Sequence, residues 1–176
     1  NGDLFGFSVT ISDDGKTIAV GAVSNDGING VNSGHVRIYR LVDNDGVSWE
    51  QIGQDIDGEA ANNFSGRSVS LSVDGSTVAI GAQGNYNNGD DSGQVTVYRI
   101  DGDGSSWERL GQTIFGNAFD EFFGGAMDIT PDGNTLAIGS PEGGAGYVRV
   151  FSLTSGDGID SADSWKQVGQ DIDGSG

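Results

Sequence analysis

The sequence predicts an all-β chain built from propeller-type blades, and three observations carry that prediction. Val and Ile outnumber Leu by 28 to 6, and β-branched side chains favour strands over helices. All three tryptophans, Trp49, Trp107 and Trp165, lie 58 residues apart. Short apolar runs separated by Gly, Asp and Asn follow one another, and no stretch shows sustained helical periodicity. We therefore expect one β unit that is repeated three times.

The same phase recurs at other positions and divides one repeat domain, 1–176, into blades. Asp-Gly pairs stand at 14–15, 74–75 and 132–133, and Gly-Gln pairs stand at 53–54, 111–112 and 169–170. We expect blade 1 at 1–58, blade 2 at 59–116 and blade 3 at 117–176. We call these ranges units 1, 2 and 3.

Each unit is expected to hold four antiparallel strands. The first strand of unit 1 covers 7–12, with matching strands over 67–72 and 125–130. Val9 and Ile11 lie two residues apart, so they share one face of that strand. A tight Asp-Gly turn then leads into the second strand.

The second strand, 17–22, is apolar on both faces, which predicts that it lies between two sheets. Ala19 and Gly21 are small, so a neighbouring sheet is expected to approach closely. The third strand is expected over 35–40. The fourth is expected to begin at the tryptophan and to continue to about Ile56.

Four-stranded units that cannot bury both faces alone are typical of propeller blades. The alternative is a repetitive β-sandwich. Since propellers have about four to eight blades, three units predict a partial propeller, half of a six-bladed ring, or an open stack of molecules joined end to end. The missing initiator Met and leader favour a longer parent protein. The expected partners are therefore further copies or further repeats of the same protein.

Composition excludes several classes of partner. The chain has 26 acidic and 8 basic residues and a net charge of −18, so its surface field repels nucleic acid and anionic membranes. No apolar run approaches the roughly 20 residues that span a bilayer, so membrane insertion is not expected. No cysteine is present, which excludes disulfides.

Short motifs at the unit ends resemble a known repeat. Phe5-Gly6, Phe123-Gly124 and Gly139-Ser140-Pro141 are similar to the two ends of the FG-GAP repeat, the blade of the integrin α-subunit propeller. The resemblance covers essentially the whole chain and implies an extracellular or cell-surface protein that serves adhesion and ligand recognition. In that family the first hairpin often carries a long calcium-binding run. The corresponding turns here are four residues long and leave no room for a calcium cage.

The hairpin turn itself, S-x-D-G-x-T in units 1 and 2, also resembles the turn of tryptophan-aspartate-repeat propellers and the sialidase Asp-box. An Asp in such a turn caps local amides, and the flanking hydroxyls tie the hairpin together. We therefore interpret the motif as structural.

Calcium is a possible cofactor at the end of the fourth strand, where acids alternate as they do in loops that present several oxygens to one cation. A solvated acidic edge that discourages sheet aggregation explains the same pattern. Unit 2 does not keep the alternating acids, because Thr113 and Phe115 stand in their places. The candidate metal ligands are Asp55, Asp57, Glu59, Asp171, Asp173 and, across the junction from unit 3, Asp3.

Loops between the second and third strands are rich in Asn, Asp and Gly, whose polar side chains hydrogen-bond sugar hydroxyls, and binding residues commonly lie on such loops. Unit 3 shortens this loop, which argues against a threefold site. The candidate ligand-binding residues are Asn25, Asp26, Asn29, Asn85, Asn88 and Asp90.

Catalysis finds little support in the sequence. The single histidine, His35, is expected to face solvent, and no cysteine or G-x-S-x-G nucleophile motif is present. The tryptophans are expected to be buried between blades rather than exposed as a sugar-binding ladder. The sequence therefore predicts a non-enzymatic extracellular structural or adhesive module that makes protein or glycan contacts within a larger assembly. The alternative is a carbohydrate-active propeller, either a lectin or a sialidase-like glycosidase.

Overall fold

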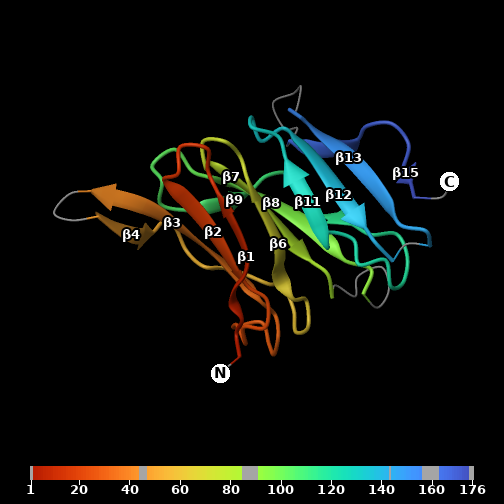
Figure 1. Ribbon diagram of the computed structural model, residues 1–176, viewed down its shortest axis with the longest axis horizontal. Helices are drawn as coiled ribbons and strands as arrows, with labels where there is room; N and C mark the ends of the chain where they lie inside the picture. The colour runs from red at the N-terminus through yellow and green to blue at the C-terminus, as the bar shows by residue number, and fades with distance from the viewer. Residues whose placement is uncertain (1, 44–46, 85–90, 143, 156–162, 175–176) are drawn as a thin grey trace.

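A computed structural model of the chain describes residues 2–43, 47–84, 91–142, 144–155 and 163–174 (Figure 1). Within these residues the chain forms three antiparallel sheets and no helix, which confirms the all-β prediction and the propeller-like blades. Each sheet is built from strands of one unit, and the sheets follow one another across the molecule in chain order.

Every sheet has the same order of strands. In each, three strands form a meander, and two further strands both pair with the third strand of the meander. The first sheet holds β1 (Phe5–Ile11), β2 (Thr17–Ala22), β3 (His35–Asp43), β4 (Val47–Gln51) and β5 (Ile56–Asp57). The second holds β6 (Ser65–Leu71), β7 (Thr77–Ala82), β8 (Gln94–Ile100), β9 (Trp107–Arg109) and β10 (Ile114–Phe115). The third holds β11 (Ala126–Ile129), β12 (Thr135–Ser140), β13 (Tyr147–Thr154), β14 (Ser164–Gln167) and β15 (Ile172–Asp173).

The predicted second strand, 17–22, coincides with β2. The prediction of one continuous fourth strand is wrong, because the chain forms two separate strands there, β4 and β5. Gly53 lies between β4 and β5 with a φ of 69°, in the left-handed region that glycine adopts without a steric penalty. The chain bends there and leaves the ladder, so β4 and β5 pair with opposite ends of β3.

The Asp-Gly hairpins have the structural role that the sequence predicts. In unit 1, Asp14 Oδ1 accepts hydrogen bonds from the Ser12 hydroxyl at 2.7 Å and from the Lys16 amide at 2.9 Å. The Ser12 hydroxyl in turn accepts from the Thr17 amide at 2.9 Å. Asp74 and Asp132 repeat the arrangement. These bonds lower the pKa of the Asp14 carboxyl below its ordinary value.

Neighbouring sheets approach most closely at glycine. A Cβ on Gly21 would overlap the carbonyl oxygen of Gly66, and a Cβ on Gly81 would overlap that of Gly124. The same carbonyls accept hydrogen bonds from the hydroxyls of Ser8 at 2.7 Å and Ser68 at 2.6 Å. The small residues of the second strand therefore allow the close sheet packing that the sequence predicts.

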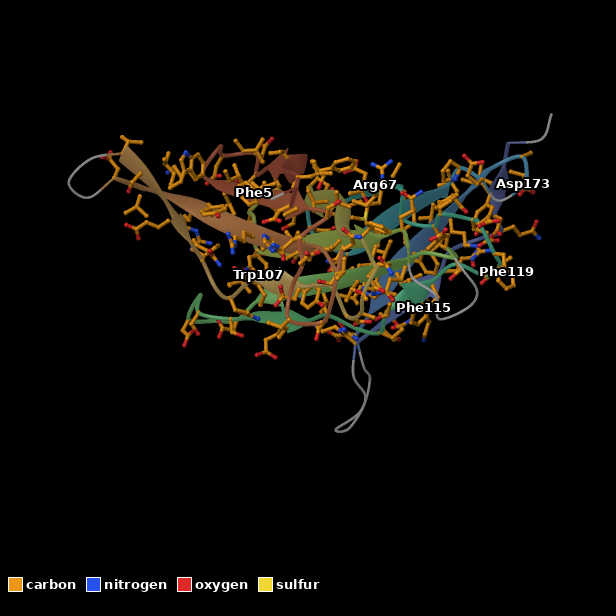
Figure 2. The ribbon with its side chains drawn as sticks, turned by 90° about the horizontal axis from the view of Figure 1, so that it is seen from below. Phe5, Arg67, Trp107, Phe115, Phe119 and Asp173 are labelled. Carbon is orange, nitrogen blue, oxygen red and sulfur yellow. The ribbon has the colours of Figure 1, made fainter. Side chains whose placement is uncertain are left out.

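Two apolar cores lie on the two faces of the second sheet. Val78, Ile80 and Trp107 pack against the first sheet, whereas Val97 and Leu110 pack against the third. Every residue of β7 is buried as a result. Figure 2 shows Phe5 and Arg67 along the upper side of the molecule and the buried Trp107 below Phe5.

A matched pair of glycine substitutions tests the close approach. Gly81→Ala should lower the free energy of unfolding by about 1–3 kcal/mol, because the methyl group cannot fit without separating the sheets. Gly139 holds the same position in unit 3, where a Cβ would meet only ordinary contacts at 3.5 Å or more, so Gly139→Ala should leave stability nearly unchanged. Urea unfolding of both variants is the measurement. Equal losses in the two variants would contradict the role of the close sheet spacing.

Candidate functional site

The most elaborate polar site is the joint between units, where a glutamine of one unit holds the tryptophan of the next. The Trp107 amide donates to Gln54 Oε1 at 3.1 Å, and Gln54 Nε2 donates to the Trp107 carbonyl at 3.0 Å. The Trp107 indole Nε1 donates to the Ile52 carbonyl at 3.0 Å. Both polar ends of the glutamine and the indole N–H are thereby satisfied at the edge of a buried contact.

The second joint repeats the first. Gln112 exchanges the same pair of hydrogen bonds with the Trp165 backbone, at 2.9 and 2.6 Å, and the Trp165 indole donates to the Leu110 carbonyl at 2.9 Å. Both tryptophans are 3% exposed, which confirms for these two residues that the tryptophan packs between blades. Sequence reasoning used the Gly-Gln pairs only to fix the repeat length, although their recurrence was the signal for this clamp.

The hairpin turns form a ladder across the three units. The Asp13 amide donates to the Val73 carbonyl at 3.0 Å, and the Val73 amide donates to the Pro131 carbonyl at 3.0 Å. Each joint therefore combines a turn contact, a serine-to-glycine contact and a tryptophan clamp.

The outer face of the first sheet carries the tryptophan half of a joint, and its apolar side chains are exposed in the described part of the chain. Val9, Ile11 and Trp49 are 61%, 57% and 43% exposed, and we call this surface the N-face. The corresponding Leu71 and Trp107 of unit 2 are buried. The N-face is apolar in the way that the internal joints are, yet it is open to solvent.

The outer face of the third sheet carries the glutamine half. Val168 and Ile172 are 52% and 61% exposed, Gln170 is exposed, and we call this surface the C-face. The matching residues of unit 2, Leu110 and Ile114, are buried.

Two donors of the internal joints are missing from unit 3. Ala126 stands where Ser8 and Ser68 donate to the next sheet, and it has no hydroxyl. Pro131 occupies the turn position that Asp13 and Val73 hold in units 1 and 2. The amides of Asp13 and Val73 donate to the next unit, but proline has no N–H. The C-face therefore offers fewer hydrogen-bond donors than the corresponding faces of units 1 and 2.

Three of the six acids predicted as calcium ligands have basic partners. Asp55 accepts from Arg37 Nε at 2.9 Å and Nη2 at 2.7 Å, and the hydrogen bonds from Arg37 lower its pKa. Asp171 is held in the same way by Arg149, and Glu59 pairs with Arg109. Arg37, Arg109 and Arg149 thus each form an ion pair with one of these acids.

The structure does not gather the candidate metal ligands. Asp57 lies opposite His35 in the pairing of β5 with β3. Asp3 lies in unit 1, where its carbonyl accepts from the Ser24 amide at 3.2 Å, whereas Asp173 pairs with Tyr147 in the third sheet. Among the described residues no group of three or more His, Asp or Glu side chains is placed to hold a metal ion. Calcium binding stays a prediction of the sequence.

The candidate ligand loop of unit 1 is built by its own polar groups. Asn29 Nδ2 donates to the Gly58 carbonyl at 2.8 Å, and Asp26 Oδ1 accepts from the Asn32 amide at 2.9 Å. The Asn25 carbonyl accepts from the Gly34 amide at 3.0 Å. These contacts fix the loop. The remaining candidates, Asn85, Asn88 and Asp90, lie outside the described residues.

His35 is buried, and the expectation that it faces solvent is wrong. It is 4% exposed, beneath Phe5, whose ring centroid lies 6.4 Å from its own. Its Nε2 atom has no hydrogen-bond partner. Burial lowers the pKa of His35, and Arg37 adds to the effect, while Asp55, Asp57 and Asp3 oppose it.

A pH titration of stability tests the burial of His35. Because the folded chain holds His35 neutral, its contribution to stability is complete above pH 6.5 and is lost as pH falls below 6.5 towards the lowered pKa. The stability of His35→Gln should fall less as the pH is lowered, because glutamine does not titrate. Glutamine fits the site, since Gln94 fills the same position in unit 2 and is equally buried. Melting temperatures of both proteins between about pH 7.5 and about pH 5.5 provide the check. Parallel pH profiles would show that His35 remains solvated.

A second matched pair tests the clamp. Gln112→Ala removes two hydrogen bonds to the Trp165 backbone and should lower the free energy of unfolding by about 2 kcal/mol. Gln170→Ala alters the same position of unit 3, where the side chain is exposed, and should change it by less than about 0.5 kcal/mol. Denaturant unfolding compares them, and a similar loss in both variants would contradict the role of the clamp.

Comparisons with known proteins agree with this architecture. The family model of the FG-GAP repeat matches residues 1–39, and no curated protein matches the chain. Two of the similar solved structures are of proteins provisionally named 6-phosphogluconolactonases. The one from Bacteroides fragilis is 16% identical with a TM-score of 0.61, and the one from Bacteroides uniformis is 19% identical with a TM-score of 0.59.

The match covers 94% of this chain but 38% and 40% of those proteins, so the chain spans about two fifths of their length. At this identity the likeness shows the fold alone, which is that of a propeller. The chain is thus a set of three propeller-type blades, and residues 1–39, in the first of them, match the model of the FG-GAP repeat.

Proposed function

We propose that the chain is a non-enzymatic structural and adhesive module that works at the cell exterior through protein contacts within a larger assembly. One observation carries the proposal: the two outer sheets expose the two halves of a joint that the chain makes twice within itself. FG-GAP repeats are typically extracellular, which supports the location. The partner that fits these faces best is a unit of the same type, and for this chain in solution it is a second copy joined head to tail.

The N-face offers every group that a preceding unit needs. By analogy with the internal joints, Trp49 would give its backbone to a glutamine and its indole N–H to a carbonyl. The Gly6 and Asp13 carbonyls would accept from a serine hydroxyl and from a turn amide. Burial of each of the side chains of Val9, Ile11 and Trp49 would contribute about 2 kcal/mol of apolar transfer free energy.

The C-face offers fewer hydrogen-bond donors than the N-face needs, which weakens the contact between two copies. Gly139 is open for close approach, and Gln170, Val168 and Ile172 are free to meet a tryptophan-bearing face. Without the serine hydroxyl and the turn amide, a joint between two copies has fewer hydrogen bonds than the internal joints. We therefore expect association that is specific and reversible rather than permanent.

Sedimentation of the purified chain at increasing concentration tests this function. The wild-type chain should associate, and Gly139→Ala should weaken association at least about tenfold, because the added methyl occupies the space into which the next sheet packs. Glu108→Ala, at an exposed position of β9, is the control and should associate like the wild type. The proposal fails if the wild-type chain remains monomeric at millimolar concentration, or if Gly139→Ala associates as strongly as the control.

A further inference from the structure

A cavity of about 360 Å³ lies where all three units meet. Its volume falls within the range of small-molecule sites, which are mostly apolar with a few polar groups. The apolar part of its lining comes from every unit, and the polar part includes one basic side chain, Arg67, its neighbour Gln83 and the acid Asp91. A second cavity, of about 500 Å³, shares Arg67 and Gln83. The apolar lining of the 360 Å³ cavity includes Phe7, Val23, Phe64 and Phe122.

Arg67 is held in place through its Nε atom and its guanidinium face, and no described residue accepts a hydrogen bond from its terminal nitrogens. Its guanidinium carbon lies 4.7 Å from the centroid of the Phe7 ring, and its Nε donates to Gln83 Oε1 at 2.8 Å. Among the described residues no carboxylate lies within ion-pair distance of Arg67, whereas Arg37, Arg109 and Arg149 each pair with one. Arg99 is likewise half-buried without an ion pair among the described residues, but it does not line this cavity.

The blade architecture does not require these two polar residues. The position of Arg67 is Phe7 in unit 1 and Gly125 in unit 3, and the position of Gln83 is Val23 and Pro141. Unit 2 alone thus introduces a cation and an amide at the meeting point of the units. This departure from the repeat is the signal by which the sequence could have identified the site.

The backbone around the cavity is strained in every unit. Leu4, Phe64 and Phe122 occupy one repeat position and have φ angles of 54°, 53° and 50°, in the left-handed region that costs non-glycine residues about 1 kcal/mol or more. All three residues line the cavity. The fold maintains this conformation three times in order to turn these segments into the first strands of their sheets.

We propose that this cavity binds a small organic carboxylate with an apolar body. The carboxylate would pair with the two terminal nitrogens of Arg67, since a guanidinium matches a carboxylate in a two-point contact. Gln83 Nε2 is available as a further donor, because only the Oε1 atom of Gln83 is used by Arg67. The apolar body would lie against Phe64, Phe122 and Val23.

The apolar body is needed because of the overall charge. A net charge of −18 repels free anions, so an inorganic anion would have only the contact with Arg67 to oppose that repulsion. A ligand that also buries an aromatic or branched body gains apolar transfer free energy from the phenylalanine rings. The site should therefore prefer an aromatic carboxylate to sulfate.

Calorimetric titration with three probes tests the proposal: 3-phenylpropionate, its neutral analogue 3-phenylpropan-1-ol, and sulfate. The wild-type chain should bind 3-phenylpropionate at least about tenfold more tightly than either of the others, the size expected for hydrogen bonds to a charged group. Arg67→Gln should weaken binding of the carboxylate at least about tenfold. Arg40→Gln removes the same charge at an exposed position of β3 and should leave binding unchanged.

Four results would overturn the proposal: no binding of 3-phenylpropionate at millimolar concentration, equal binding of the alcohol, equal binding of sulfate, or equal losses in the two arginine variants. A readout on the wild-type chain avoids dependence on the folding of Arg67→Gln. The Nε–H resonance of Arg67 should shift as 3-phenylpropionate is added and should not shift with the alcohol. An unmoved resonance at saturation would place the ligand elsewhere.

Discussion

The distance between neighbouring sheets is the constraint on which the rest of the structure depends, and glycine sets it. Where Gly21 faces Gly66 and Gly81 faces Gly124, no side chain separates the backbones. Only at that spacing can a serine hydroxyl reach the next sheet, a hairpin amide reach the next turn, and a glutamine grip the next tryptophan. One close contact therefore brings three others into register in each joint.

Because each unit buries its faces only against its neighbours, stability and recognition have the same physical basis. Trp107 and Trp165 are buried by a preceding unit, while Trp49 has the same chemistry and is exposed. Repeat proteins of this kind gain stability from the contacts between neighbours, and their end units need a cover or a partner. The end sheets are therefore the natural places for contacts with further units, and the loss of donors at Ala126 and Pro131 makes the two ends unequal.

Local features of the sequence predicted local structure well. The apolar run of β2 and the Asp-Gly turns are set by neighbours in the chain, so both were predicted correctly. His35 was not, because its burial comes from Phe5 above it and β5 beside it. The pairing of Asp55 with Arg37 joins residues 18 apart, and the clamp joins residues 53 apart. No periodicity within one strand encodes contacts at such separations.

The joint can be observed directly in the exchange of the three indole protons with solvent. In the dilute chain the indole N–H groups of Trp107 and Trp165 donate to carbonyls of the preceding unit, whereas the Trp49 side chain is exposed. Hydrogen exchange measured by NMR should be slow for Trp107 and Trp165 and fast for Trp49, and the exchange of Trp49 should slow as concentration rises. Equal exchange of the three protons, or a Trp49 rate that does not respond to concentration, would contradict the account.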